Sequence, residues 1–273
     1  MENQYQTPHK RRVRYKGKYP KKFEEKYKEL QPEKYKDTIE HVIQKGNTPA
    51  GMHISIMVKE IIDFLNIQPG EIGFDATLGY GGHTKAMLQC LNGKGHIYAT
   101  DVDPEESDKT KKRLAEQGFG EDMLTVKLQN FCTIDEIAKE VGGFDFILAD
   151  LGVSSMQIDN PKRGFSFKVD GPLDLRLNQE AGISAAERLD TISRDELAGM
   201  LYENSDEPYC EELAKAITDE IRRGNRIDTT TKLRQVIEKT LDFLPEKEKK
   251  DTIKKTCQRT FQALRIDVNR EFE

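Results

Sequence analysis

A glycine-rich segment directly after an apolar run is the first feature of this sequence that could do chemistry. The run 72–74 ends in Asp75, and Gly79, Gly81 and Gly82 follow before a helix-like segment. Glycine lets the backbone turn sharply and lets a ligand lie against bare main chain, so this order predicts a strand, a ligand-binding loop and a helix. The segment lacks the Lys-Ser/Thr pair of a phosphate-binding loop, and taken alone it could equally be a plain strand-to-helix turn.

Two further carboxylates follow apolar runs and indicate where a ligand would lie. Asp101 ends the run 96–100 about 20 residues beyond the glycines, where Rossmann-type folds place the acid that binds ribose hydroxyls. An acid before a helix that begins at Pro104 could instead cap that helix. Asp150 follows the apolar run 144–149, which is typical of a strand covered on both faces. We expect the glycine loop, Asp101 and Asp150 to meet at the carboxyl ends of a parallel sheet.

The elements that position these residues alternate between strands and helices. Four apolar runs separated by helix-like segments give the order β-α-β-α-β-α-β, which predicts an α/β fold with a doubly wound parallel sheet. The expected strands cover 72–74, 96–100, 124–128 and 144–149. After residue 158 the alternation stops, and Ser184 and Ser193 each begin a capping box with a Glu three residues later. Helices are expected over 208–223, 230–243, 246–255 and 259–273.

The composition excludes several classes of protein. A third of the 273 residues are charged and the mean hydropathy is −0.72. No run approaches the roughly 20 apolar residues of a membrane span, so we expect a soluble, cytoplasmic protein with no membrane partner. The four cysteines lie far apart and never form C-x-x-C. Free thiols in a reducing compartment therefore fit better than disulfides or a zinc site, and no metal site is predicted.

The charge of the chain is distributed unevenly. Residues 1–36 contain twelve Lys and Arg against five Asp and Glu, a net +7, so residues 37–273 carry −12 within the overall −5. Five tyrosines are set among the basic residues. Cations can neutralise phosphates and aromatic rings can stack on bases. Residues 1–47 therefore form a basic extension that either binds nucleic acid or serves as a solvated, flexible arm, and the sequence favours neither.

Several longer motifs, taken together, resemble one known family. The matching segments lie in order along residues 53–273: His53–Ser55, Asp75–His83, Asp101–Pro104, Asp150–Ser155 with Gln157, Arg163–Phe167, Asp170–Arg176, Ser184–Glu187 and Arg259–Arg265. The glycine loop is common to many methyltransferases, whereas the stretch 163–176 is highly specific. On these motifs the chain resembles the bacterial small-subunit rRNA cytosine-N4 methyltransferases, known as RsmH or MraW.

The resemblance implies a fold and a division into domains. It implies a class I methyltransferase, Rossmann-like sheet formed by residues 48–158 and 256–273, with an inserted all-helical substrate-binding domain over 159–255 and the basic extension 1–47 before them. The usual sheet of this class has seven strands, but only four can be counted here. The family continues beyond the position of Glu273. We therefore expect a C-terminally truncated chain or a fragment, with the last strands missing and the edge of the sheet open.

The resemblance also implies an activity and a cofactor. Members of the family transfer the methyl group of S-adenosylmethionine to N4 of a cytidine in 16S rRNA near the decoding centre, so the small ribosomal subunit is the implied partner. By family match, the cofactor pocket is lined by Gly81, Gly82, His83, Asp101, Phe131, Asp150 and Gln157. Asp150 is the candidate catalytic residue, because an acid at this strand end can orient the donor or hydrogen-bond the amine. Phe131 would pack on the adenine, although it could equally belong to the core.

The stretch from Arg163 to Arg176 and the helices after it are expected to grip RNA. Arg163, Lys168 and Arg176 are candidates to contact phosphates, and Phe165 and Phe167 could stack on a flipped base. A structured turn that is anchored by its phenylalanines is an equal alternative.

Other functions stay open at the level of the sequence. One is a truncated, non-catalytic RNA-binding homologue, and another is a methyltransferase of a small molecule or protein. A nicotinamide-dependent dehydrogenase is disfavoured by the spacing of the loop and by the segment 150–155. Neither the oligomeric state nor the activity of a chain that ends at Glu273 follows from the sequence.

Overall fold

A computed structural model describes residues 55–272, apart from the side chains of Ser155 and Met156. These residues belong to one compact unit, His53–Glu273. The basic extension, residues 1–47, lies outside the described residues, so the expectations for it stay predictions. Within residues 55–272, none of the helices has the length and apolar character that a bilayer crossing requires.

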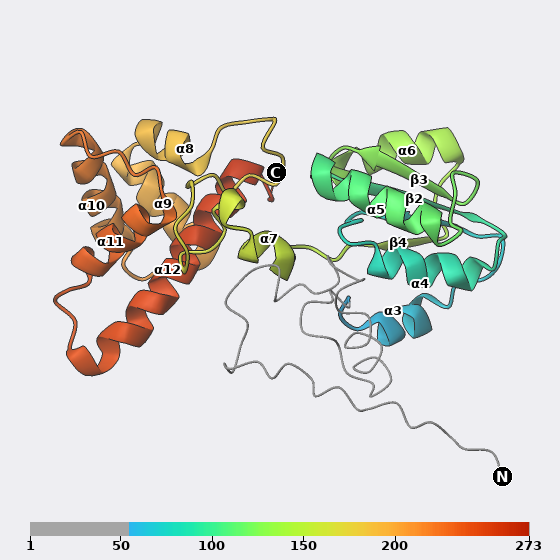
Figure 1. Cartoon of the computed structure of the whole chain (residues 1–273), viewed down its shortest axis with the longest axis horizontal. Coiled ribbons are helices and arrows are strands. Elements are labelled where there is room, and N and C mark those ends of the chain that lie inside the picture. Colours follow the sequence, from blue (N-terminus) through green and yellow to red (C-terminus); the bar gives the residue numbers. More distant parts are fainter. Residues whose placement is uncertain (1–54, 273) are drawn as a thin grey trace, which may run out of the picture. The chain divides into compact units, whose positions relative to one another are not determined.

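Four parallel strands form the sheet that the alternation of apolar runs predicts. They are β1 (Ile72–Asp75), β2 (His96–Asp101), β3 (Leu124–Leu128) and β4 (Phe146–Leu148), in the spatial order β3-β2-β1-β4 (Figure 1). Phe74 of β1 lies opposite Tyr98 of β2 and Ile147 of β4. The order reverses between β1 and β4, and doubly wound sheets bind ligands at such a switch point, outside the carboxyl ends of the strands. The predicted α/β fold with a parallel sheet is confirmed.

Helices cover both faces of the sheet, because successive side chains of a strand point to opposite faces. The helices are α3 (Val58–Leu65), α4 (Gly82–Leu91), α5 (Pro104–Glu116) and α6 (Ile134–Val141). On one face, Ile97 and Ala99 of β2 share a buried cluster with residues of α3, α4 and α5. On the other face, Phe74 packs with Ile137 of α6 and with Tyr98. The strands that carry the loops are therefore fixed by packed helices on both faces of the sheet.

The α-helices after β4 form a second group, and all of them except α7 share a core of their own. They are α7 (Ser155–Asp159), α8 (Ala185–Thr191), α9 (Arg194–Ser205), α10 (Cys210–Arg222), α11 (Thr230–Thr240) and α12 (Glu246–Asn269). One cluster of buried apolar side chains joins α8 to α12, separately from the clusters of the sheet. The capping box at Ser184 is confirmed, since Ser184 and Glu187 each accept the other's backbone N–H. Ser193 caps α9 by accepting the Glu196 N–H, whereas the Glu196 carboxylate accepts from Arg188.

The C-terminal segment forms one long helix instead of the two that were expected. The expected ends at 255 and 259 lie inside α12, which runs without a break from Glu246 to Asn269. Cys257, Phe261 and Leu264 recur at helical spacing and are buried in the helical core, so packing continues through the expected gap. The boundary at 255/256 that the family resemblance implies falls within this helix. The division of the chain into domains stays a prediction.

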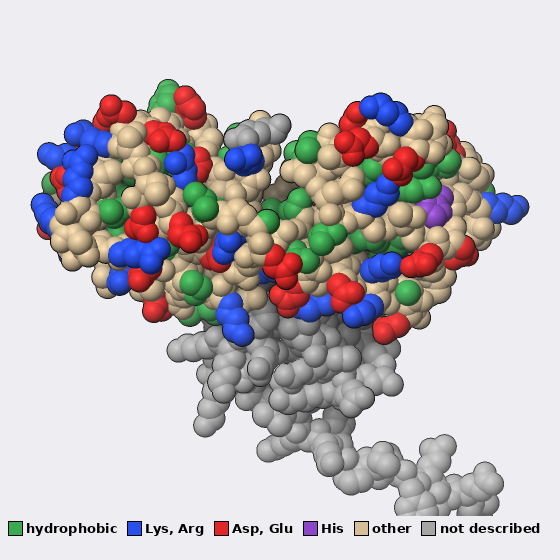
Figure 2. Space-filling model, turned by 90° about the horizontal axis from the view of Figure 1, so that it is seen from above, with side chains coloured by type: hydrophobic (Ala, Val, Ile, Leu, Met, Phe, Trp, Pro, Cys, Tyr) green, Lys and Arg blue, Asp and Glu red, His purple; other side chains and the backbone are tan. Residues whose placement is uncertain are grey.

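The surface of the described residues mixes charges of both signs. On the face shown in Figure 2, Lys and Arg side chains are interspersed with Asp and Glu. Among the described residues, exposed side chains of opposite charge form ion pairs, such as Arg226 with Asp190 (2.8 Å) and Arg194 with Glu211 (3.5 Å). Exposed pairs of this kind contribute about 0–1 kcal/mol each to folding stability, so their main effect is to keep the surface hydrated. This face carries no extended field of one sign that would by itself attract a phosphate backbone.

A carboxyl group is buried inside the helical core, just after α9. Glu207 has no exposed surface, and one of its oxygens accepts from the Tyr209 N–H (3.1 Å) and the Thr256 hydroxyl (3.3 Å). Its other oxygen, Oε2, has no hydrogen-bond partner among the described residues. The buried hydroxyl of Thr260 in α12 likewise has none among them. The guanidinium of Arg259 is 4.0 Å from Oε2. Burial raises the pKa of Glu207 above its ordinary value, because removing a carboxylate from water disfavours the charged form.

We expect Glu207→Gln to stabilise the protein at neutral and mildly alkaline pH by about 1–3 kcal/mol. A carboxyl group whose pKa is higher in the folded than in the unfolded protein stabilises the fold at pH values below its unfolded pKa. This stabilisation is lost as the pH rises through the pKa that the group has in the folded protein. Glutamine has no charge to bury, so the variant avoids this loss. Thermal unfolding from pH 5 to pH 8 measures the effect, with Glu203→Gln on the exposed face of α9 as the control. An unchanged or lower melting temperature at pH 8 would contradict the expectation.

Candidate functional site

The loop between β1 and α4 brings bare backbone to the carboxyl end of the sheet. Gly81 has a φ of 73°, and a Cβ atom there would lie 2.7 Å from Cγ2 of Thr110. A Cβ atom on Gly82 would lie 2.2 Å from Oγ of Ser55. Both positions thus require glycine for conformation or space. No described side chain caps α4 at this end, so first-turn N–H groups are available to an external acceptor.

Asp75 fastens this loop to the helix that follows. It is 1% exposed, and it accepts hydrogen bonds from the Thr84 hydroxyl (2.6 Å) and the Thr77 N–H (3.0 Å). Burial raises the pKa of Asp75, while these two hydrogen bonds oppose the rise. The side chain is therefore occupied in holding β1 and α4 together, and its role is to shape the loop.

Asp101 stands at the end of β2 and faces the same loop. Its carboxylate accepts the Gly79 N–H at Oδ2 (2.8 Å) and the Asp103 N–H at Oδ1 (2.9 Å). Burial raises the pKa of Asp101 above its ordinary value, although these hydrogen bonds act against it. Asp101 does not cap α5. The cap is Asp103, whose side chain accepts the N–H groups of Glu105 and Glu106. An ionised carboxylate has about four acceptor positions, so Asp101 retains capacity for a ligand's hydroxyl groups.

Asp150 lies two residues after β4, beside the imidazole of His83. Its backbone N–H donates to the Thr77 hydroxyl (2.8 Å), and its side chain is 42% exposed. His83 is buried, and its Nε2 lies 3.4 Å from Oδ2 of Asp150. Nε2 makes no hydrogen bond within the described residues, so this carboxylate is the charged group it faces. The pair combines a buried imidazole with a carboxylate that is open to the surrounding space.

Phe131 and Gln157 complete the set of residues expected to bind a cofactor. Phe131 begins a short 3-10 turn after β3 and keeps 36% of its surface exposed. Gln157 lies in α7 and accepts the Ser154 N–H (2.9 Å) with its side-chain oxygen. Its amide nitrogen donates to Oδ2 of Asp103 (3.1 Å). The side chain of Gln157 is therefore engaged with the protein, whereas Phe131 is partly exposed.

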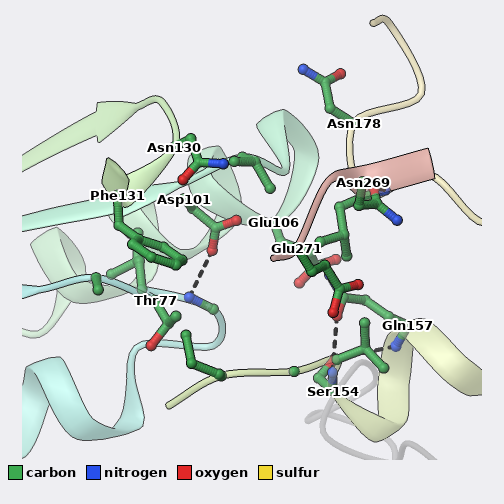
Figure 3. Close-up of a pocket in the computed structure, with 18 of the residues that line it drawn as sticks. Thr77, Asp101, Glu106, Asn130, Phe131, Ser154, Gln157, Asn178, Asn269 and Glu271 are labelled. Carbon is green, nitrogen blue, oxygen red and sulfur yellow. Dashed lines mark hydrogen bonds between the residues drawn. The ribbon is translucent and has the colours of Figure 1, made fainter. Parts of the chain in front are cut away.

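All of the residues expected to bind a cofactor line one cleft with a volume of about 1550 Å³. Thr77, Asp101 and Phe131 stand around it at or just beyond the ends of strands, while Asn269 and Glu271 belong to the C-terminal segment (Figure 3). Small-molecule pockets typically enclose about 300–1,000 Å³, so this cleft has room for a cofactor and part of a second molecule. Among residues 55–272 no group of three or more His, Cys, Asp or Glu side chains is placed to hold a metal ion.

The residues expected to contact RNA are placed in different environments. Arg163 is 4% exposed and paired with Asp103. Phe165 belongs to the helical core, and Phe167 packs against Phe261 of α12 with ring centroids 5.7 Å apart. Lys168 is exposed.

Arg176 also lines the cleft, and it is held by an aspartate. Its Nε and a terminal nitrogen donate to the two carboxylate oxygens of Asp174 (2.7 and 2.9 Å). This ion pair lowers the pKa of Asp174, although burial acts in the opposite direction. Of the five RNA candidates, only Arg176 thus shares the cleft with the cofactor candidates, while Arg163 and Phe165 are buried in this arrangement.

One carboxylate of this region was not singled out from the sequence. Asp103 is 1% exposed and accepts hydrogen bonds from its own helix, from Gln157 and from Arg163. An acid directly before Pro104 is a helix-cap signal, and that signal was assigned to Asp101 as an alternative. The distant partners of Asp103 have no counterpart in local sequence.

Comparison with known proteins gives concordant matches along the whole described chain. The profile of the MraW methylase family matches residues 50–273. A ribosomal RNA small subunit methyltransferase H 1 from Agathobacter rectalis is 87% identical over 265 residues, which are 97% of this chain and 76% of the relative. A protein of the same name from Lachnoclostridium phytofermentans is 70% identical, covering 100% of this chain and 74% of the relative. A ribosomal RNA small subunit methyltransferase H 2 from Alkaliphilus metalliredigens is 62% identical, covering 100% and 78%.

Proposed function

Because the chain belongs to the MraW methylase family, a family of methyltransferases, we propose that it transfers a methyl group from S-adenosylmethionine to N4 of a cytidine in 16S rRNA. The observation that supports this most is the convergence of Asp101, Asp150 and the uncapped N-terminus of α4 on one cleft at the switch point of a class I methyltransferase sheet. The names of the relatives given above support small-subunit rRNA as the substrate. We place the reaction in the cytoplasm, where small ribosomal subunits are assembled.

The side chains and backbone at the head of the cleft fit S-adenosylmethionine. This molecule has no phosphate, and the loop has no phosphate-binding lysine. Its carboxylate can be bound by the first-turn N–H groups of α4, because the helix dipole and the missing cap both favour an anion there. Asp101 can accept hydrogen bonds from the ribose, and the exposed ring of Phe131 offers a face to the adenine. Gly81 and Gly82 allow the ligand to approach the backbone.

We assign to Asp150 the role of the group that takes the proton of the amine. S-adenosylmethionine supplies, when bound, an electrophilic methyl group on a sulfonium leaving group. N4 of cytosine loses a proton when it is methylated, and the half-exposed carboxylate of Asp150 can accept a hydrogen bond from N4–H and then that proton. Thr77 holds the backbone of Asp150 in place (2.8 Å), and His83 lies against the side of its carboxylate (3.4 Å). We assign to His83 the orientation of this carboxylate.

The RNA-binding part of the proposal rests on cations that remain accessible. Lys168 is exposed and Arg176 lines the cleft, so these two stay as candidates for phosphate contacts. Arg163 and Phe165 would have to leave buried positions to contact RNA. Because phosphate contacts release counterions, RNA affinity should fall as salt is raised.

Methyl-group mapping tests the proposal directly. Purified chain is incubated with small ribosomal subunits and radiolabelled S-adenosylmethionine, and the rRNA is digested and analysed by mass spectrometry. We expect label in N4-methylcytidine at a single site. Label in another nucleotide, in protein or in a small molecule would show that the proposed substrate is wrong. Cofactor binding by calorimetry without any transfer would instead support a non-catalytic RNA-binding homologue.

A further inference from the structure

We propose that Arg163 is a positioning residue for the cofactor site, which acts through Asp103 to hold Asp101 in place. This inference rests on the proposed function, because it assigns Asp101 to the ribose. Arg163 is then not one of the exposed RNA-binding cations, and its role lies at the cofactor site.

The first observation is the burial of the ion pair. The side chains of Arg163 and Asp103 are 5% and 1% exposed, and a terminal nitrogen of Arg163 lies 3.0 and 2.8 Å from the two carboxylate oxygens of Asp103. Two charges that are removed from water this completely must compensate each other. Removal of the guanidinium would leave a buried carboxylate with only neutral donors, so the loop around Asp103 would have to move toward water.

The second observation is the number of donors that converge on Asp103. Besides Arg163, its oxygens accept the N–H groups of Glu105 (3.1 Å) and Glu106 (3.2 Å) and the amide of Gln157 (3.1 Å). The carboxylate thus ties the start of α5 to α7 and to the segment after it. A side chain with this many fixed partners has one available orientation, and its backbone is fixed along with it.

The third observation links this backbone to the ribose acid. The N–H of Asp103 donates to Oδ1 of Asp101 (2.9 Å), and the N–H of Gly79 donates to Oδ2 (2.8 Å). Asp101 is therefore held between the glycine loop on one side and the Asp103 backbone on the other. If the Asp103 backbone shifts, one of the two hydrogen bonds that orient the Asp101 carboxylate is lost.

The fourth observation is what anchors Arg163 itself. Its other terminal nitrogen donates to the carbonyl of Leu177 (2.9 Å), and the N–H of Leu177 donates to the side-chain oxygen of Asn269 in α12 (2.7 Å). The guanidinium is thus fixed from the helical part of the chain. The position of Asp103 depends in this way on a residue 60 positions further along the sequence.

Calorimetric titration with S-adenosylhomocysteine tests the proposal. We expect Arg163→Met to weaken binding at least tenfold in the otherwise unaltered chain. In an Asp101→Ala background the same change should weaken binding less than threefold, because Arg163 acts only through Asp101. Such non-additivity is the signature of residues that work as one unit. Arg163→Lys keeps the positive charge beside Asp103, so it should bind more tightly than Arg163→Met. Lysine lacks the planar fork that spans Asp103 and Leu177, so the affinity should be restored only in part.

The control variant separates positioning from general stability. Arg259 also lies beside a buried carboxylate, 4.0 Å from Oε2 of Glu207, and neither of these two residues lines the cleft. Arg259→Met should change the dissociation constant less than twofold, even if it lowers the melting temperature. If circular dichroism shows that Arg163→Met is poorly folded, the same double-mutant cycle with Asp101→Ala is measured with Arg163→Lys.

Three results would overturn the proposal. A dissociation constant within twofold of the unaltered chain in both Arg163 variants would show that the pair is only structural. Equal effects of Arg163→Lys with and without Asp101 would show that it acts by another route. Absence of binding by the unaltered chain would overturn the proposed function and this role together, which distinguishes it from the first two results.

Discussion

Replacement of Asp150 by asparagine is expected to lower kcat for methyl transfer by about 10²- to 10⁴-fold, the range typical of a lost general base. Asparagine has the same shape, and the backbone N–H of residue 150 still donates to Thr77, so the strand end keeps its position. The amide has no negative charge to accept the N4 proton. We expect the rate to fall far more than the affinity for the cofactor. Single-turnover methylation of small subunits, with saturating S-adenosylmethionine, measures the rate.

A matched control for this variant is Asp135→Asn. Asp135 is a solvent-exposed carboxylate in the first turn of α6, paired with Lys139 at 2.7 Å, and its replacement should leave kcat within twofold. An Asp150→Asn chain that retains more than half of the unaltered rate would contradict the assigned role. A large loss of cofactor affinity with an unchanged rate would show that Asp150 binds the methyl donor and does not accept the proton.

Asp101→Ala is expected to weaken S-adenosylmethionine binding by about 10²-fold. A hydrogen bond to a charged group contributes about 1.5–3 kcal/mol, and about 1.4 kcal/mol corresponds to a tenfold change in affinity. Loss of the acceptor also frees the Gly79 and Asp103 N–H groups that it now holds, which loosens the loop. Isothermal titration calorimetry at pH 7.5 measures the dissociation constant.

The pH dependence of binding gives an independent check on Asp101. Burial raises the pKa of Asp101, so its carboxylate becomes protonated at a higher pH than an exposed aspartate, whose pKa is about 3.9. The ionised form is the stronger acceptor, because protonation turns one of its oxygens into an O–H donor and removes the negative charge. Affinity should therefore fall on acidification, beginning above that value, and the fall should be much smaller in Asp101→Ala.

Glu106 provides the control for this pH profile, because it also lines the cleft and burial raises its pKa as well. Glu106→Gln should keep the acid-side fall if Asp101 is responsible for it. A profile that becomes flat in Glu106→Gln, or an Asp101→Ala chain that binds within threefold of the unaltered one, would remove Asp101 from the ribose site.

Much of the α/β layer could be predicted because its signals are local. Apolar runs that end in Asp75 and Asp101, each followed by a helix-like segment, give the parallel sheet, and parallel strands place their carboxyl ends at one edge. That rule brought Asp101 and Asp150 to the same cleft. The capping box at Ser184 is equally local, since both of its hydrogen bonds lie within four residues.

The predictions that changed concern side chains whose environment depends on distant residues. Arg163 and Phe165 lie in a stretch rich in charges and turn formers, for which RNA contact and a structured turn anchored by its phenylalanines are equal expectations. Both are buried, one against Asp103 and the other in the helical core. The expected break in α12 had a similar origin, since the polar residues around position 256 concealed the contacts that bury Cys257 and Phe261.

The amino-acid order alone was sufficient for the alternating elements, the glycine loop and the acids at the strand ends, because periodicity and turn chemistry act over a few residues. Only the folded chain revealed that Asp103 caps α5 while it holds Arg163 from 60 residues away. A carboxylate accepts any suitable donor that packing brings to it. Which donor arrives is therefore decided by how the helical segment is packed, and nothing in the neighbouring sequence encodes that choice.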